Sequence, residues 1–162
     1  MSNALVVIDV QNGFISKSSM HIIPRIKKML VKNKFDHVIF TIFVNPKQSP
    51  WKKWMGWHNV SKSPEIDIVQ ELSAFAHHVF EKNTYSSFTD SFEKFLKNEK
   101  ITELYLVGID TEACVFKTAL DAFEKGYRPI VLSKYCASHE SASYHKLALK
   151  LLRRLIGEEQ VQ

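Results

Sequence analysis

Three short runs of apolar residues stand out along the chain because they do not alternate with polar positions. They cover residues 4–8, 37–44 and 104–109, and they are rich in β-branched and aromatic side chains. Short, continuous runs of this kind are typical of strands that are buried on both faces of a parallel sheet. Residues 78–80 and 129–132 are two shorter candidates. The pattern predicts a mainly parallel sheet of five or six strands.

Between the predicted strands, apolar residues recur every three or four positions, which is the spacing of an amphipathic helix. Four such segments cover residues 22–31, 88–96, 113–123 and 141–156. In the last segment, four leucines are expected to face inward: Leu147, Leu151, Leu152 and Leu155. Strands that alternate with helices predict a doubly wound α/β fold with helices on both faces of the sheet. We expect one such domain over residues 1–162.

Composition and charge argue against several classes of protein. Apolar residues make up 45% of the chain and charged residues 24%, close to the average for globular proteins. No run approaches the roughly 20 apolar residues of a membrane helix, and the N-terminus lacks the pattern of a signal peptide. We therefore expect a cytoplasmic protein with no membrane partner. The net charge of +5 comes from scattered basic residues without a recognised motif, so no nucleic-acid partner is expected.

The chain contains two cysteines, Cys114 and Cys136, and no CxxC pair. This pattern argues against a disulfide scaffold and against a Cys-rich zinc site. Cys136 follows the last predicted strand, and we interpret it as a small buried residue. Cys114 is expected in the first turn of a helix, where the helix dipole and free backbone N–H groups favour the thiolate and stabilise an oxyanion. Cys114 is therefore the candidate nucleophile.

Charged residues follow two other predicted strands: Asp9 after residues 4–8, and Lys82 after residues 78–80. Ligands bind beyond the carboxyl ends of the strands in a doubly wound sheet, so we expect both residues near Cys114. Taken alone, Asp9 fits a loop-capping residue equally well, and Lys82 fits an ordinary surface lysine. Together with a thiol they fit a nucleophilic site, in which the lysine activates the sulfur and the aspartate accepts its proton.

Three segments, in this order, resemble the isochorismatase-like cysteine hydrolases, which include nicotinamidases and N-carbamoylsarcosine amidases. They are ALVVIDVQNGF at residues 4–14, KNTYSSF at 82–88 and VGIDTEACV at 107–115. The resemblance continues over nearly the whole chain. It implies an Asp-Lys-Cys triad, here Asp9, Lys82 and Cys114, that acts through a thioester. It also implies a homodimer or a homotetramer.

The resemblance further implies an oxyanion hole formed by the backbone amides of Asp110 and Cys114, after a cis peptide bond at Ile109–Asp110. The chain departs from the nicotinamidases at two positions. Phe43 and Asn45 stand where those enzymes carry the Asp and His of a metal site. A phenylalanine cannot ligate a metal, so we expect no metal and no cofactor.

All three tryptophans, Trp51, Trp54 and Trp57, lie in a proline-rich segment that fits neither pattern. Their spacing of three residues places them along one face if the segment turns helically. Two interpretations stay open: an aromatic lid over a small flat or apolar substrate, or an anchor for a long loop or a dimer contact. With Phe14 and Tyr85 they are the candidate pocket residues.

The sequence supports two functions. The leading hypothesis is a metal-independent cysteine hydrolase of a small amide, ureide or related carbonyl compound, an amidase acting on C–N bonds other than peptide bonds. The alternative is a non-catalytic protein that binds small molecules or other partners and keeps the hydrolase fold. A thiol redox function is a third option, but it lacks a resolving cysteine nearby in the sequence. The substrate stays open, since a fold does not determine it.

Overall fold

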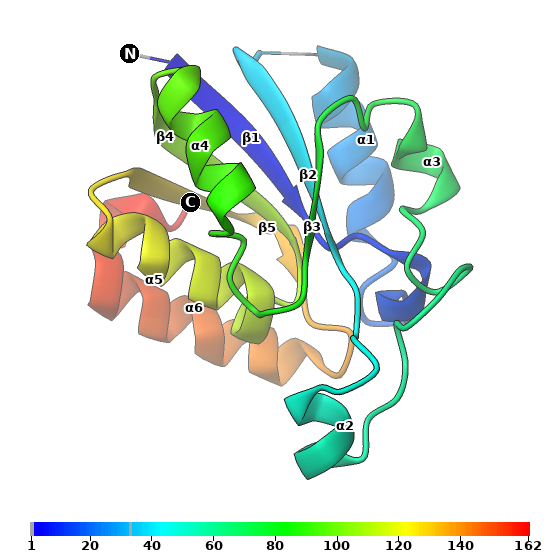
Figure 1. The fold of residues 1–162 in the computed structure, drawn as a ribbon. Helices are drawn as coiled ribbons and strands as arrows, with labels where there is room; N and C mark the ends of the chain where they lie inside the picture. The colour runs from blue at the N-terminus through cyan, green and yellow to red at the C-terminus, as the bar shows by residue number, and fades with distance from the viewer. Residues whose placement is uncertain (1, 33) are drawn as a thin grey trace.

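The sheet is five-stranded and parallel throughout, in the order β3-β2-β1-β4-β5. The computed structural model describes residues 2–32 and 34–162 (Figure 1). The strands are β1 (Ser2–Ile8), β2 (His37–Phe43), β3 (Val79–Lys82), β4 (Ile101–Ile109) and β5 (Arg128–Ala137). The prediction of a parallel sheet is confirmed, with five strands rather than six in the described residues, and the run at residues 4–8 forms the central strand.

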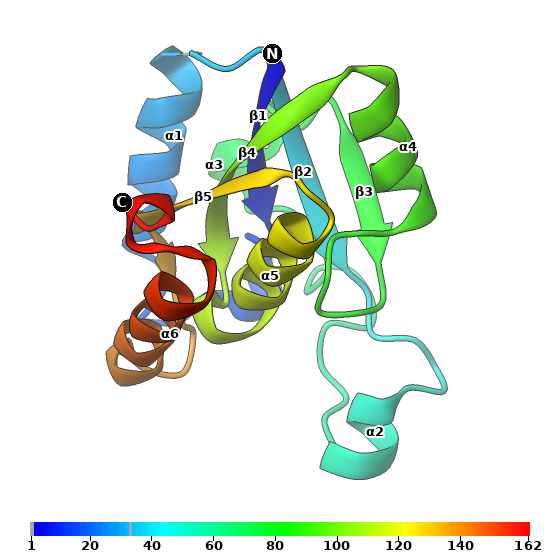
Figure 2. The same cartoon turned by 90° about the vertical axis from the view of Figure 1, so that its left-hand side faces the viewer.

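Helices cover both faces of this sheet, as the alternating pattern predicts. They are α1 (Ile22–Lys32), α2 (Pro50–Met55), α3 (Gln70–Ser73), α4 (Asp90–Asn98), α5 (Phe116–Glu124) and α6 (Ala142–Ile156). Three short turns complete the chain: η1 (Asn12–Phe14), η2 (Thr111–Val115) and η3 (Glu158–Gln160). Helices α1 and α3 pack on one face, and α4, α5 and α6 on the other (Figures 1 and 2). No helix in the described part of the chain has the length and apolar character needed to cross a membrane.

The central strand β1 explains why its sequence does not alternate. Leu5 and Val7 join the core beneath α1 and α3, whereas Ala4, Val6 and Ile8 join the core beneath α4, α5 and α6. All five side chains are fully buried. Because both faces of the strand are covered, every position favours an apolar residue.

The expected orientation of α6 is partly wrong. Leu152 is buried as predicted, but Leu147, Leu151 and Leu155 are exposed. The buried residues of the helix are Ala148, Leu149, Leu152 and Ile156. Two apolar stripes therefore compete on this helix, and periodicity alone cannot decide between them.

Strands β1 and β4 approach each other very closely at Gly108. This residue has φ of +125°, and a Cβ atom built on it would lie 2.0 Å from the backbone oxygen of Ile8. Only glycine fits a left-handed conformation with a neighbouring backbone at this distance. The contact holds the carboxyl ends of the two strands together, and Asp9 and Asp110 follow directly after them.

Candidate active site

Three parallel strands bring Asp9, Lys82 and Cys114 to one edge of the sheet. Asp9 follows β1, Lys82 ends β3, and Cys114 lies in η2 after β4. The Nζ atom of Lys82 lies 2.6 Å from Oδ2 of Asp9 and donates a hydrogen bond to Sγ of Cys114 at 3.4 Å. All three side chains are buried. The sequence-based grouping of these residues thus corresponds to a contiguous cluster in which the lysine contacts both partners.

The carboxylate of Asp9 is bonded to side chains of β2 and β3 rather than to loop amides. Its Oδ1 accepts a hydrogen bond from the hydroxyl of Thr41 at 2.7 Å, and its backbone N–H donates to the oxygen of Thr41 at 3.2 Å. Its Oδ2 lies 2.6 Å from Nζ of Lys82 as an ion pair. The carboxylate is therefore buried beside the ammonium group that also contacts the sulfur of Cys114.

Lys82 is held as an ammonium group. Its Nζ also donates to the backbone oxygens of Thr84 at 2.9 Å and Tyr85 at 3.2 Å. Burial alone would lower the pKa of Lys82, but the charges of Asp9 and Cys114 and the hydrogen bonds to both outweigh it, so the pKa is raised. The lysine supplies a fixed positive charge beside the thiol.

Cys114 lies in the first turn of a helical segment, as expected: η2 is a π-helical turn that continues directly into α5 at Phe116. The expected preference for the thiolate is wrong. Burial, followed by the charge of Asp9, raises the pKa of the Cys114 thiol well above its ordinary value, against the opposing effect of Lys82. Arguments from a helix terminus leave out this desolvation, which disfavours the thiolate. At neutral pH the sulfur carries its proton and needs a base to release it.

The peptide bond between Ile109 and Asp110 is cis, at the position that the family resemblance implies. The carbonyl oxygen of Asp110 then accepts hydrogen bonds from the amides of Ala113 at 3.1 Å and Val115 at 3.0 Å. These two bonds set the turn that carries the sulfur of Cys114.

The second cysteine, Cys136, is buried as expected. Its thiol lies 3.7 Å from the backbone oxygen of Leu106, and burial raises its pKa to about 12. Both cysteines are free thiols. Cys136 therefore acts as a small apolar residue of the core.

A cavity of about 230 Å³ opens beside the sulfur of Cys114. Its aromatic walls come from Phe14, Phe43, Trp51, Trp57 and Tyr85. The indole N–H of Trp51 donates to the hydroxyl of Tyr85 at 3.1 Å, and the rings of Phe14 and Trp57 are stacked with centroids 6.2 Å apart. Four of the five predicted pocket residues therefore line this cavity, together with Phe43.

The fifth, Trp54, does not belong to the cavity. Helix α2 ends at Gly56, and the chain turns back so that the amide of Trp57 donates to the oxygen of Trp51 at 3.0 Å. Trp54 lies on this six-residue helix, which projects from the body of the molecule (Figure 1). Its side chain is 74% exposed, and the ammonium of Lys53 lies over its ring. The prediction that Trp54 lines the pocket is therefore wrong: Trp51 and Trp54 lie on the same short helix, but only Trp51 faces the cavity.

The residues at the family's metal position do not fit a metal ion. Phe43 lines the cavity with an apolar ring. The side-chain amide of Asn45 donates to the backbone oxygens of Trp57 and Asn59, and its oxygen accepts from the hydroxyl of Ser49 at 2.6 Å. Among residues 2–32 and 34–162, no group of three His, Cys, Asp or Glu side chains is close enough to hold a metal. The available donors therefore provide no resident metal site here.

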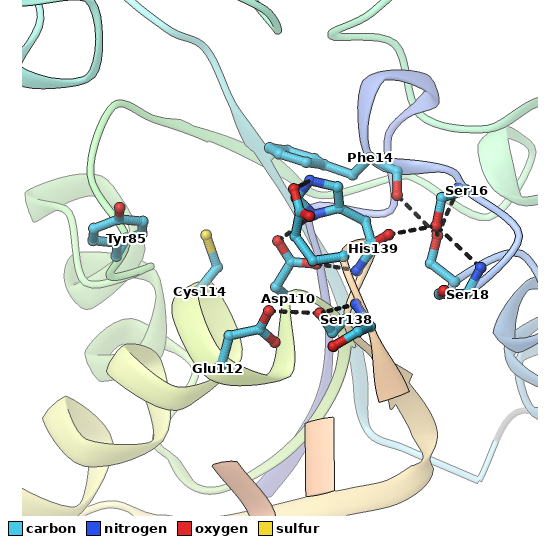
Figure 3. Close-up of polar contacts among 12 residues, drawn as sticks. Phe14, Ser16, Ser18, Tyr85, Asp110, Glu112, Cys114, Ser138 and His139 are labelled. Carbon is cyan, nitrogen blue, oxygen red and sulfur yellow. Dashed lines mark hydrogen bonds and ion pairs between the residues drawn. The ribbon is translucent and has the colours of Figure 1, made fainter. Parts of the chain in front are cut away.

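Sequence reasoning missed a second polar group at the cavity, the pair formed by His139 and Asp110. The Nδ1 atom of His139 lies 2.6 Å from Oδ2 of Asp110, and its backbone N–H donates to Oδ1 at 2.7 Å. Figure 3 shows Cys114 between Tyr85 and this pair, with the ring of Phe14 over the imidazole. His139 lies two residues after the observed end of β5 but seven residues beyond the predicted strand at 129–132, so its position gave no clear sequence signal.

Comparison with known proteins agrees with this geometry. The family model of the isochorismatase domain matches residues 3–160. The chain belongs to the isochorismatase family. Isochorismatase family protein 2B of Dictyostelium discoideum is 34% identical over 118 residues, which cover 64% of this chain and 51% of that relative. The chain thus spans about half the length of this relative.

Two solved structures share the fold over their full length. Nicotinamidase PncA from Bacillus subtilis is 26% identical, with a TM-score of 0.83, and the match covers 99% of each chain. Pyrazinamidase/nicotinamidase from Streptococcus mutans UA159 is also 26% identical, with a TM-score of 0.86, and the match covers 99% of this chain and 100% of that one.

Proposed function

We propose that this protein is a metal-independent cysteine hydrolase that cleaves the C–N bond of a small amide or ureide. Membership of the isochorismatase family supports hydrolase chemistry, and the similarity to nicotinamidases supports the amide class. The observation that carries the proposal is the double contact of Lys82, which joins the carboxylate of Asp9 to the sulfur of Cys114.

In the first half of the proposed reaction, Asp9 takes the proton of the thiol as Cys114 attacks the carbonyl carbon. A C–S bond forms, and the negative charge moves to the carbonyl oxygen. The backbone amides of Asp110 and Cys114 donate to this oxyanion, while Lys82 stabilises the sulfur as it loses its proton. Asp9 then gives its proton to the departing nitrogen, and the C–N bond breaks to leave a thioester.

In the second half, water replaces the amine beside the thioester. Asp9 takes a proton from this water, whose oxygen attacks the thioester carbon. The C–S bond breaks, and the sulfur regains a proton as the acid product leaves. The raised pKa of Cys114 fits this cycle, because the thiol is the resting form and Asp9 moves its proton in both directions.

One structural feature argues against a non-catalytic protein that only retains the fold. Trp51 and Trp57 line the cavity without filling it, and about 230 Å³ of space stays open beside Cys114. A substrate therefore has room to reach the sulfur.

The test is ammonia release from a panel of small amides and ureides, with Cys114→Ala as the control. We expect turnover of at least one compound by the wild type and none by the variant. Mass spectrometry of the wild type during turnover should detect an acyl group on the peptide that contains Cys114. Absence of turnover across the panel, or equal turnover by Cys114→Ala, would refute the proposal.

A further inference from the structure

His139 is held at the wall of the cavity from several directions. Its backbone N–H and its ring Nδ1 contact the two oxygens of the same carboxylate, that of Asp110. Its carbonyl oxygen accepts a hydrogen bond from the hydroxyl of Ser16 at 2.7 Å, and the ring of Phe14 lies with its centroid 5.7 Å from that of the imidazole. The imidazole is therefore fixed in orientation before a ligand binds, which lowers the entropic cost of recognition.

The loop that carries His139 is also tied to the turn that carries the nucleophile. The hydroxyl of Ser138 donates to Oε1 of Glu112 at 2.6 Å and accepts from the amide of Ser141 at 3.2 Å (Figure 3). Glu112 lies in η2, two residues before Cys114. These contacts fix the imidazole and the sulfur relative to each other.

The ring chemistry leaves one atom of His139 for a ligand. Asp110 takes the Nδ1 side, so Nε2 is the free end, and it lies 3.3 Å from Oε1 of Glu140. The hydrogen bond to Asp110 raises the pKa of His139; partial burial opposes this, and the charges of Asp110, Glu140 and Glu112 add to it. Protonation turns Nε2 into a hydrogen-bond donor, and a charged donor of this kind binds carboxylates well.

We propose that His139 binds a carboxylate of the substrate, and that the substrates are small planar amides that carry such a group. The carboxylate of Glu140 already occupies the position beside Nε2. Its side chain is 67% exposed, so it can turn into solvent when a substrate carboxylate replaces it. The aromatic walls suit a flat body, and the cavity volume of about 230 Å³ limits its size. This inference rests on the proposed function, because the same cavity contains Cys114.

The test measures binding separately from turnover, by calorimetry with the Cys114→Ala protein. The anionic ligands are 3-carbamoylbenzoate and 4-carbamoylbenzoate. The comparison ligands, which lack the carboxylate, are benzamide, the neutral 3-acetylbenzamide and the cationic 3-(aminomethyl)benzamide. We expect one carbamoylbenzoate isomer to bind about 10- to 100-fold more tightly than benzamide, which is the range for a hydrogen bond to a charged group.

Four substitutions test whether the preference for a carboxylate depends on the contact with His139. His139→Phe keeps an aromatic ring and should abolish the preference, and Asp110→Asn should weaken it. Glu140→Gln should strengthen carboxylate binding, because the internal competitor loses its charge. His77→Gln, at an exposed position before β3 at the opposite edge of the sheet, should leave the preference unchanged. Thermal unfolding of each variant establishes that it is folded, and if His139→Phe does not fold, Asp110→Asn and Glu140→Gln decide the question.

Turnover by the wild type separates the two proposals. If amides are hydrolysed without a preference for a carboxylate, the role of His139 is wrong and the hydrolase function stands. If carboxylate binding depends on His139 but no amide is hydrolysed, the hydrolase function is wrong and the binding role stands. Failure of both isomers to bind, tighter binding of the cationic compound, or an unchanged preference in His139→Phe would overturn the role of His139.

Discussion

The ammonium of Lys82 lies 2.6 Å from Oδ2 of Asp9, although Lys82 ends β3 and Asp9 follows β1, and β2 lies between these two strands. Both side chains are almost completely removed from solvent. Each charge of a buried ion pair loses its hydration, and only the opposite charge and further hydrogen bonds can replace it. The same contact therefore constrains both stability and chemistry, and each consequence can be measured separately.

Substitution of Asp9 should separate the reactivity of the thiol from catalysis. Asp9→Asn keeps the shape of the side chain but removes the proton acceptor, so kcat should fall about 100- to 10,000-fold. Asp9 also raises the pKa of Cys114, so its loss should lower that pKa and increase labelling of the sulfur by iodoacetamide at neutral pH. Mass spectrometry of both cysteine peptides provides the measurement, with buried Cys136 as the internal reference. An unchanged kcat would exclude Asp9 as the base.

Loss of Lys82 should destabilise the protein more than loss of the whole pair. Lys82→Met leaves the buried carboxylate of Asp9 without a counterion, which we expect to cost about 3–5 kcal/mol in the free energy of unfolding. The double variant Lys82→Met/Asp9→Asn removes both charges and should recover part of this loss. Urea denaturation of the wild type, Lys82→Met, Asp9→Asn and the double variant gives the coupling free energy between the two charges. Additive losses would show that the two charges are independent.

Much of the fold could be predicted because β1 and β4 are buried on both faces. Residues 4–8 have no exposed face, so their continuous apolar run identified a strand that is buried on both sides. The grouping of Asp9, Lys82 and Cys114 followed from the rule that parallel strands end at one edge. Neither inference needed side-chain packing.

The failures came where packing or solvent decides the outcome. Leu147 lies on the apolar stripe of α6 that faces solvent, and the ring of Trp54 is exposed on α2 although Trp51 of the same helix lines the cavity. The pKa of Cys114 depends on burial that the sequence does not contain. The contact of His139 with Asp110 joins loops that are distant in the chain. The expected homodimer or homotetramer and the cytoplasmic location stay predictions.

Substitution of Gly108 should strongly destabilise the fold. Gly108→Ala places a Cβ against the backbone oxygen of Ile8 at a residue with positive φ, and neither strand can move without breaking the central pairing. We expect a loss of at least about 3 kcal/mol in the free energy of unfolding. Gly126→Ala is the matched control, because Gly126 also has positive φ but a Cβ atom added there would meet open space. If the two variants lose the same stability, the close approach of the strands contributes nothing.

The tryptophans should differ in their effect on substrate binding. Trp57→Ala removes a ring that stacks on Phe14 in the cavity, so KM should rise about tenfold, equivalent to about 1.4 kcal/mol. Trp54→Ala removes an exposed ring, so KM should change by no more than about twofold. Steady-state kinetics on one hydrolysed amide compares the two. Equal effects would mean that Trp54 also contacts the substrate.

The contact between His139 and Asp110 should stabilise the fold in a pH-dependent manner. The pKa of His139 is raised in the folded protein, chiefly by its hydrogen bond to Asp110, with smaller contributions from Glu140 and Glu112. A group with a raised folded-state pKa contributes its full stability below its ordinary pKa of about 6.5, and the contribution is lost as pH rises through the folded-state value. The difference in unfolding free energy between the wild type and His139→Gln should therefore be larger at about pH 6 than at about pH 9. The wild type and the variant are compared at the same pH. The contributions of other titrating groups to the unfolding free energy, including that of His145 with its lowered pKa, therefore cancel in the difference. A difference that grows towards high pH would mean that His139 is neutral in the folded protein, and binding of a substrate carboxylate would then need another cation.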